Sequence, residues 1–587
     1  MTMPHADAPT PGRPLRIWPG VAIVALQWLF RFGVPVVAPD AMVYGILGGM
    51  AGLVGVVVWW VFFSRARVAE RIGAIVLLAV GFGAAWRGLD VSMATGAQGM
   101  LFPLLAAPVV SLAFVAWAAA ANRLTGGLRW GTMAATILLA CSVWTLVRTG
   151  GLNGNFENEL MWRWAKNPEE RLLAVATPVA PSPAAPIVAD PKKEAVAAPP
   201  SLPLAAKLVG DWPGFRGAER DGVVRGVRIE TDWKTAPPVE LWRRPIGPGW
   251  SSFSVSGEFF YTQEQRGDDE MVTCYRVASG EPVWMHKDAA RFWESNAGAG
   301  PRATPTLHNG RVYTLGATGI VNVLDARNGA VVWTRNAAAA TGAKRPEWGF
   351  AGSPLVVDDL VIVAASGRLV AYDLATGEPR WTERSGGASY SSPRLLTIDG
   401  VRQVLLVNAT GVMGAGVADG AALWRHAWKG YPIVQPGVTE DGNILISVSD
   451  SSGTRRLSAK HGQEGWSVEE RWTSNGLKPY FNDFVVHAGH AYGFDGSILA
   501  CIDLADGKRK WKGGRYGQGQ LVLLADQDLL LVLSEEGELA LVKATKDQYT
   551  ELARRPAIEG KTWNHPVLTG NVLLVRNGEE MAAFRLQ

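Results

Sequence analysis

The chain has 587 residues, of which 48% are hydrophobic and 19% are charged, and its formal net charge is +4. The net charge is small and the sequence has no block of consecutive Lys and Arg. These two observations argue against a nucleic-acid-binding protein. The three cysteines, Cys141, Cys274 and Cys501, exclude a disulfide framework, a c-type haem attachment and a cysteine-based zinc site.

The first part of the chain is depleted of charge. Residues 1–150 contain 14 charged side chains, whereas the other 437 residues contain 96. Uncharged runs at 41–63 and 100–121 are 23 and 22 residues long, which exceeds the roughly 20 residues that span a bilayer core. Shorter runs at 17–30, 72–86 and 131–147 complete a predicted membrane domain, residues 1–150, with about five transmembrane helices.

Arginine positions predict the orientation of these helices. With a cytoplasmic N-terminus, seven Arg residues flank the helices on the inner side, and the two outer loops hold only Arg31 and Arg87. Five spans then place the rest of the chain in the periplasm of a bacterium with a multi-pass inner-membrane anchor. Four spans would leave it in the cytoplasm, so the side depends on the weak run at 131–147.

Residues 151–207 are predicted to form a juxtamembrane segment and a linker. Between residues 174 and 207 there are eight Pro and eleven Ala, a composition that favours an extended spacer without a core.

A repeat begins after the linker and runs to the end of the chain. Its clearest copy is AYDLATGEPRW at 371–381, in which a Gly turn is followed by Trp four residues later. Trp recurs at positions 242, 284, 333, 381, 424, 472 and 511, at intervals of 39 to 49 residues. Such a period is typical of a β-propeller, whose blades each contain four short strands.

Eight first strands can be counted, and they predict an eight-bladed propeller over residues 208–587. The last blade has no fourth strand of its own, and we expect the segment at 238–243 to supply it and close the ring. We assign a structural role to the blade Trp residues, because a large ring can pack on the next sheet while its N–H reaches a backbone acceptor. These residues are Trp242, Trp284, Trp333, Trp381, Trp424 and Trp511.

These motifs resemble a known family. The A-x-D-x-x-T-G-x-x-x-W element resembles the repeat of pyrroloquinoline quinone (PQQ) propellers, and DWPGFRGAERDG at 211–222 resembles the first segment of bacterial PQQ-binding-like propeller proteins. The resemblance implies a fold in which N-terminal transmembrane α-helices precede an all-β, quinoprotein-like propeller. One branch of this family contains quinoprotein dehydrogenases, and another contains non-catalytic propellers such as the outer-membrane assembly scaffold.

Polar residues gather in the loops that precede the innermost strands, which surround one mouth of a propeller's channel, and in the turns between the second and third strands, which we expect to open on the same side. We predict a pocket for a ligand or cofactor there, since Arg and Lys suit an anionic ligand. The pocket candidates are Arg266, Arg302, Lys478, Tyr480, Asn482, Arg515, Gln518 and Asn564. The catalytic candidates, should the protein be an enzyme, are Asp483, Glu264 and His565. The alternative is that such residues only satisfy backbone groups around the channel.

Two functions are compatible with these motifs. The first is a membrane-anchored periplasmic module that binds a small-molecule ligand or a protein partner. The second is a PQQ- and calcium-dependent dehydrogenase that oxidises a sugar or an alcohol, with Asp483 or Glu264 as the base and Arg302, Lys478 and Arg515 holding the cofactor. No metal site is assigned, and no cofactor is assigned beyond these two.

Overall fold

The computed structural model describes residues 15–38, 41–121, 124, 126–154, 158–175, 211–384, 386–448 and 452–587. The chain forms two compact units, the first containing Met1–Ala165 with Ser295–Ala297, and the second Lys166–Glu294 with Gly298–Gln587. The predicted linker therefore lies mostly outside the described residues, and its first part falls in the second unit.

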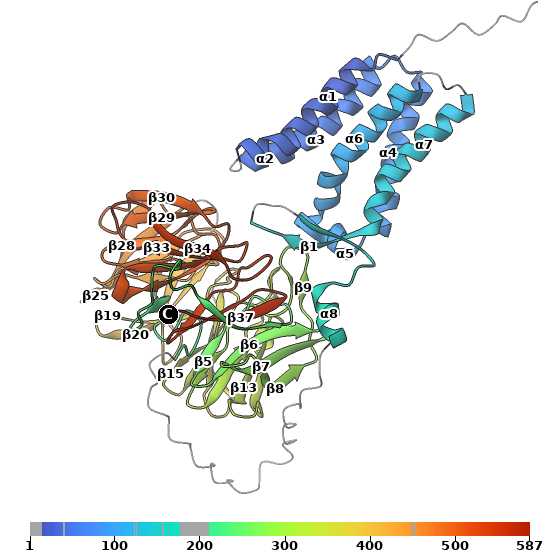
Figure 1. The fold of residues 1–587 in the computed structure, drawn as a ribbon. Helices are drawn as coiled ribbons and strands as arrows, with labels where there is room; N and C mark the ends of the chain where they lie inside the picture. Colours follow the sequence, from blue (N-terminus) through green and yellow to red (C-terminus); the bar gives the residue numbers. More distant parts are fainter. Residues whose placement is uncertain are drawn as a thin grey trace, which may run out of the picture. The chain divides into compact units, whose positions relative to one another are not determined.

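The first unit is a bundle of apolar helices (Figure 1). Four are long and apolar enough to cross a membrane, over Trp18–Val37, Met42–Phe63, Val68–Gly88 and Leu101–Ala120. The elements are α1 (Trp18–Trp28), η1 (Leu29–Gly33), α2 (Val34–Val37), α3 (Met42–Val58), η3 (Trp59–Phe63), α4 (Val68–Gly88), α5 (Val91–Thr95), η4 (Gly96–Gly99), α6 (Leu101–Ala120), α7 (Gly126–Ser142), η6 (Val143–Leu146), β1 (Val147–Leu152) and β2 (Asn158–Trp162).

The fifth expected span forms α7, which is 17 residues long and packs against α4 and α6. Arg129 in its first turn forms an ion pair with Glu70 of α4, at 3.1 Å. The α-helix ends at Ser142 and covers only part of the expected run at 131–147, whose last residues form η6 and the start of β1; a crossing of the membrane by α7 stays a prediction.

The second unit is an eight-bladed β-propeller, as the sequence predicts. In seven of the blades the four antiparallel strands follow one another in sequence order, with the first strand of each blade nearest the axis. The first four blades are β5 (Ser254–Ser256), β6 (Phe259–Arg266), β7 (Asp269–Arg276) and β8 (Pro282–Asp288); β11 (Thr306–His308), β12 (Arg311–Leu315), β13 (Ile320–Asp325) and β14 (Val331–Asn336); β15 (Leu355–Val357), β16 (Leu360–Ala365), β17 (Arg368–Asp373) and β18 (Pro379–Glu383); and β19 (Arg394–Ile398), β20 (Val401–Asn408), β21 (Gly411–Gly416) and β22 (Ala422–Ala427).

The remaining blades complete the ring. They are β23 (Gly437–Val438), β24 (Ile444–Ser447), β25 (Thr454–Gly462) and β26 (Gly465–Ser474); β27 (Val485–His487), β28 (His490–Asp495), β29 (Ile498–Asp503) and β30 (Arg509–Arg515); β31 (Gln520–Leu524), β32 (Leu529–Leu533), β33 (Glu538–Lys543) and β34 (Glu551–Pro556); and β35 (Val567–Thr569), β36 (Val572–Arg576) and β37 (Glu580–Arg585) with β4 (Val239–Pro245). Elements outside the blades are α8 (Pro168–Val175), β3 (Val223–Val224), β9 (Trp293–Glu294), β10 (Gly298–Ala299), α9 (Ala337–Thr341) and η7 (Ala525–Gln527).

The eighth blade closes the ring with a strand from the start of the propeller. β4 pairs antiparallel with β37, and Trp242 lies opposite Ala583. This pairing covers the edge that the last three-stranded sheet would otherwise expose.

Tryptophan side chains connect six of the eight blades to the next blade. Six indole N–H groups donate to a backbone carbonyl at the end of the third strand of the following blade, over 2.7 to 3.2 Å. The donors are Trp242, Trp284, Trp333, Trp381, Trp472 and Trp511. Trp424 differs, since its N–H donates to Gln403 Oε1 at 2.5 Å within its own blade. The fifth blade, which follows it, replaces the usual turn with the long hairpin of β25 and β26.

The same indole rings pack closely against glycines in the turns of the neighbouring blades. Gly377 has a φ of +72°, and a Cβ atom added there would lie 2.6 Å from the Trp333 ring. Two features therefore require glycine at this position: the left-handed backbone conformation and the close approach of the indole ring.

We expect Gly377→Ala to lower the propeller's stability more than Gly400→Ala does. Both glycines have a positive φ, but nothing lies within 4 Å of a Cβ at Gly400. Gly400→Ala should cost about 1 kcal/mol, and the displaced Trp333 ring should add about 1–3 kcal/mol for Gly377→Ala. Thermal unfolding of the two variants measures this difference, and equal melting temperatures would contradict the interlock.

Candidate functional site

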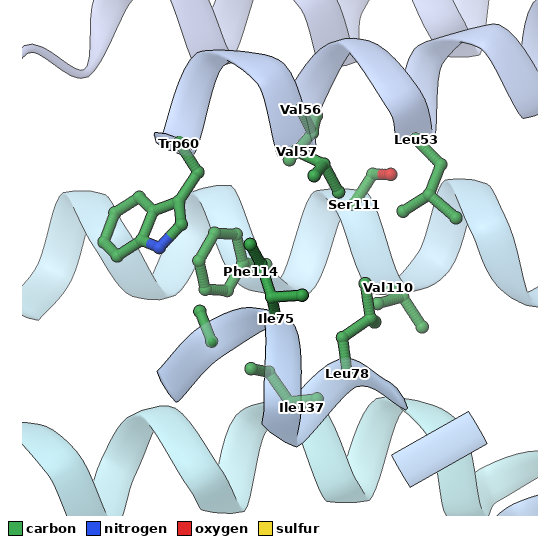
Figure 2. Close-up of a pocket in the computed structure, with 11 residues that line it drawn as sticks. Leu53, Val56, Val57, Trp60, Ile75, Leu78, Val110, Ser111, Phe114 and Ile137 are labelled. Carbon is green, nitrogen blue, oxygen red and sulfur yellow. The ribbon is translucent and has the colours of Figure 1, made fainter. Parts of the chain in front are cut away.

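The first unit contains a small cavity between α3, α4, α6 and α7 (Figure 2). Its volume is about 30 Å³, and ten of its eleven lining residues are apolar or aromatic. Ser111 supplies the single hydroxyl, which is too few partners to hold a water molecule well. This cavity therefore offers no chemistry beyond helix packing.

The propeller axis is occupied by the chain itself. Residues 211–224, named here the axial segment, contact the innermost strands, or the loops before them, of seven blades. Trp212 pairs with Val255 of the first blade, and β3 runs parallel to β31 of the seventh. Arg220 donates to the carbonyl oxygens of Ser353, Pro354 and Pro393, from two further blades. The family-like motif DWPGFRGAERDG thus fills the centre of the ring.

A ring of hydrogen bonds, named here the polar belt, lies just before the innermost strands. The backbone N–H of one blade donates to a side-chain oxygen of the next blade, from the first blade to the sixth, over 2.7 to 3.0 Å. The members are Ser252, Thr304, Ser353, Ser392, Gln435 and Asp483. Ser252 Oγ also donates to the carbonyl of His565 in the eighth blade, at 2.5 Å. Many of the polar side chains in these loops therefore connect neighbouring blades.

Asp483 and His565, two catalytic candidates, lie against the axial segment. Asp483 accepts the N–H of Gln435 at 2.7 Å, and Arg216 lies 3.7 Å from its carboxylate. Burial raises the pKa of Asp483, while Arg216 and the Gln435 N–H act in the opposite direction. Burial lowers the pKa of His565 to about 3, and the charge of Arg216 acts in the same direction. His565 is therefore neutral at physiological pH, with Nδ1 bonded to the carbonyl of Pro566 at 3.0 Å.

Glu264, the third catalytic candidate, sits in a buried ionic network. Its carboxylate accepts hydrogen bonds from the Gly247 N–H and the Tyr275 hydroxyl, each at 2.6 Å, and from Arg266 at 3.2 Å. Burial would raise the pKa of Glu264, but Arg266, Tyr275 and Arg576 outweigh it, and the pKa lies below its ordinary value. Glu264 and Arg266 are thus brought together as partners of each other.

The other basic candidates are also engaged. Arg302 donates to Glu294 at 3.2 Å and to the carbonyls of Ala299 and Gly298, while its guanidinium lies 4.8 Å from the Phe292 ring centre. Lys478 pairs with Asp495 at 3.2 Å, and Arg515 donates to Ser497 Oγ at 2.6 Å. Lys478 and Arg515 therefore both bond within the sixth blade and its adjoining loops.

The amide candidates lie deeper, before consecutive innermost strands. Asn482, Gln518 and Asn564 come from the loops before β27, β31 and β35, and all three are buried. Asn482 Oδ1 accepts the Tyr480 N–H at 2.9 Å, and Asn564 Nδ2 donates to the Ser251 carbonyl at 2.8 Å. Tyr480 itself is 40% exposed.

Aromatic side chains form a rim around the axis on the same face, a feature that was not predicted from the sequence. The aromatic rim consists of Trp250, Trp348, Tyr390, Tyr431, Tyr480, Phe481 and Trp563, from the loops before six innermost strands. Ring centres of Trp250 and Trp563 are 4.8 Å apart, those of Trp563 and Phe481 are 4.9 Å apart, and Tyr431 is 62% exposed. The signal available in the sequence was the recurrence of an aromatic residue four to seven positions before these strands.

Lys561 stacks on the rim, with its ammonium 4.7 Å from the Trp563 ring centre. Burial raises the pKa of Tyr390 to about 12, and Glu347 and Tyr431 contribute to the same direction. The rim therefore combines apolar ring faces with charges of both signs.

The residues present do not fit the PQQ and calcium that the resemblance suggested. PQQ carries carboxylates that need free cationic groups, but Arg302 and Lys478 are each paired with an acidic residue. Calcium takes six to eight oxygen ligands, and Glu264 and Asp483 are each held by Arg side chains. Among the described residues no cluster of three His, Cys, Asp or Glu is placed to bind a metal. We derive no reaction step through these groups.

Glu270 is a buried carboxyl between the first two blades that sequence reasoning missed. It accepts the Ala317 N–H at 2.9 Å and lies directly opposite Asp288 across β7 and β8. Burial raises the pKa of Glu270 to about 7; the Ala317 N–H and the Thr318 hydroxyl lower it, and Asp288 raises it again.

The comparisons with known proteins agree with this architecture. The family model described as "Outer membrane protein assembly factor BamB" matches residues 239–415 and 409–585. The chain belongs to this family. Proteins of that name are 26% identical over 249 residues in Moranella endobia and 24% identical over 331 residues in Burkholderia pseudomallei. These alignments cover 39% and 47% of this chain, and 61% and 84% of the two relatives.

Two solved structures are among those similar to this chain. BamB from Moraxella catarrhalis is 14% identical, with a TM-score of 0.45, over 59% of this chain and 99% of that one. A europium-containing methanol dehydrogenase is 12% identical, with a TM-score of 0.43, over 65% of this chain and 99% of that one.

Arg220→Met should destabilise the propeller, because it leaves several carbonyl groups on different blades without their donor. We expect a loss of about 3 kcal/mol, given about 1–3 kcal/mol for each buried group left unpaired. Arg225→Met is the control: Arg225 pairs with Asp221 at the surface, with 57% of its side chain exposed, and should stay within about 0.5 kcal/mol. Chemical denaturation measures both, and similar losses would contradict the central role of Arg220.

Glu270→Gln should remove a pH dependence of stability. Between about pH 4.5 and pH 7 the unfolded chain releases the Glu270 proton while the folded chain retains it, so wild-type stability falls as pH rises through this window. The shift in the Glu270 pKa corresponds to about 3 kcal/mol of unfolding free energy, and the wild-type protein has lost all of it above pH 7. Melting curves at pH 5 and pH 8 test this, with the exposed Glu378→Gln as the control. Parallel pH profiles for wild type and Glu270→Gln would contradict it.

Proposed function

We propose that this protein is a membrane-anchored interaction module whose propeller binds a partner protein in the periplasm through the aromatic rim. The observation that carries the proposal is the rim itself, in which Tyr431 and Tyr480 are 62% and 40% exposed around the axis. Trp, Tyr and Arg are the residues that dominate binding energy in protein interfaces. The family supports the same direction, since its relatives are named as assembly factors.

The chemistry of the rim indicates the kind of partner. Exposed basic residues stand on the same loops, namely Lys344, Arg345, Arg384 and Lys429. An extended partner segment with aromatic or apolar anchors and acidic neighbours would match both features, because complementary charge steers association while the buried rings supply affinity.

The membrane side of the proposal rests on α7. Its 17 residues pack against both α4 and α6, which supports a fifth span. With the Arg distribution of the sequence, an odd number of spans places the propeller outside the cytoplasm.

Photo-crosslinking tests the proposal in cells that express the full chain. A photoreactive phenylalanine analogue at Tyr431 or Tyr480 should capture a discrete partner. The same analogue at Lys508, in an exposed turn at the other end of the sixth blade, should not. Equal capture at all three positions, or none at the rim, would rule out the rim as the docking surface.

The double variant Tyr431→Ala and Tyr480→Ala should weaken binding of the captured partner by tenfold or more, about 1.4 kcal/mol. Lys508→Ala should leave it unchanged. Circular dichroism on the same samples establishes that the propeller remains folded, and unchanged affinity of the folded double variant would count against the proposal.

A further inference from the structure

Three buried amides beneath the aromatic rim each carry one polar atom without a partner among the described residues. These atoms are Asn482 Nδ2, Gln518 Oε1 and Asn564 Oδ1. Their residues are 0%, 8% and 1% exposed. The orientation of Asn564 is fixed, because its Nδ2 already donates to the Ser251 carbonyl at 2.8 Å. The orientation of Asn482 is fixed in the same way by the Tyr480 N–H at 2.9 Å.

The three amides lie in one sector of the axis. They come from the sixth, seventh and eighth blades, two or three residues before each innermost strand. Glu535 connects two of these loops, since it accepts the backbone N–H of Gln518 at 3.0 Å and the indole N–H of Trp563 at 2.7 Å. The Trp563 ring in turn lies 4.9 Å from Phe481, and these residues directly precede Asn564 and Asn482.

The axial segment adds a fourth unpaired atom at this level. Arg216 is 2% exposed, and its Nε has no partner among the described residues. Its charge is balanced by Asp483, 3.7 Å away. The sector therefore offers two donors, from Asn482 and Arg216, and three acceptors, from Gln518, Asn564 and His565 Nε2.

These groups define the chemistry of what pairs with them. Unpaired buried polar atoms cost free energy, and a cluster of them indicates a bound molecule that pairs with them. A carboxylate cannot donate to the two amide oxygens, and an ammonium cannot accept from the two N–H donors. A hydroxyl group both donates and accepts.

We propose that this sector binds the hydroxyl groups of a small uncharged molecule, either ordered water or a polyol. The site goes beyond the proposed interaction function, because it lies under the rim and does not require a protein partner.

Gln518→Met tests the proposal by the sign of its effect. Methionine has a similar shape and removes the amide oxygen. If hydroxyl groups pair with Gln518 Oε1, the variant of the full chain should melt roughly 2–4 °C lower than wild type. If nothing pairs with this oxygen, removing it should leave the melting temperature unchanged or raise it, which would overturn the proposal.

Tyr372→Phe is the matched control. The Tyr372 hydroxyl is another buried atom without a partner among the described residues, but it belongs to β17 in the third blade. Its removal should not lower the melting temperature, so an equal fall in both variants would also overturn the proposal.

A titration distinguishes the two sources of hydroxyl groups. In a detergent without a sugar headgroup, erythritol should raise the melting temperature of wild type, but not of Gln518→Met, in a saturable way if a polyol binds. An absence of any saturable shift, together with the lower melting of Gln518→Met, assigns the site to water.

A density map of the wild-type chain keeps the proposal testable if Gln518→Met fails to fold. It should show a peak about 3 Å from Gln518 Oε1 and Asn564 Oδ1, and an empty sector would overturn the proposal.

Discussion

The propeller depends on one strand pairing, that of β4 with β37, which joins residues more than 300 positions apart. Each blade buries its faces against its two neighbours, so an open ring would leave two apolar sheet faces and one strand edge in water. The Trp242 indole shows how the closure is secured, because β4 brings it to the Val277 carbonyl of the first blade. The axis, the polar belt and the aromatic rim exist only in the closed ring.

Closure of the ring brings backbone groups together around the axis, and the axial segment supplies hydrogen-bond partners for them. Arg220 reaches carbonyls of two blades, and Arg216 reaches the Phe484 carbonyl of the sixth. An Arg side chain suits this task since it carries five donors in a planar fork. The charged residues that the sequence predicts at an open channel mouth therefore mostly pair with one another or with backbone groups.

Much of the fold could be predicted because its determinants are local and periodic. The Gly turn and the Trp four residues later sit in one hairpin, so the pattern is visible at 371–381 without knowledge of the next blade. The site could be predicted only as a set of loops. Glu264 pairs with Arg266 within one strand, but its contact with Gly247 comes from the loop before the blade, and the bond from Arg220 to Pro393 spans 173 residues. No local pattern records such partners, so Asp483 and His565 could be placed near the axis but not recognised as covered by the axial segment.

The two ends of the ring are under different constraints. At the end that carries the Asp-to-Gly turns, Gly377 must remain glycine because the Trp333 ring covers it, and the same holds for Gly280 beneath Trp242. Substitution there breaks a contact between blades. At the other end, the polar belt needs a side-chain oxygen from the loops of the second to the sixth blade, and the rim above it adds ring contacts between blades, such as that of Trp250 with Trp563. The aromatic rim also carries exposed side chains. Tyr431 is 62% exposed in this layer, and the proposed docking function gives such exposed rings the task of contacting a partner.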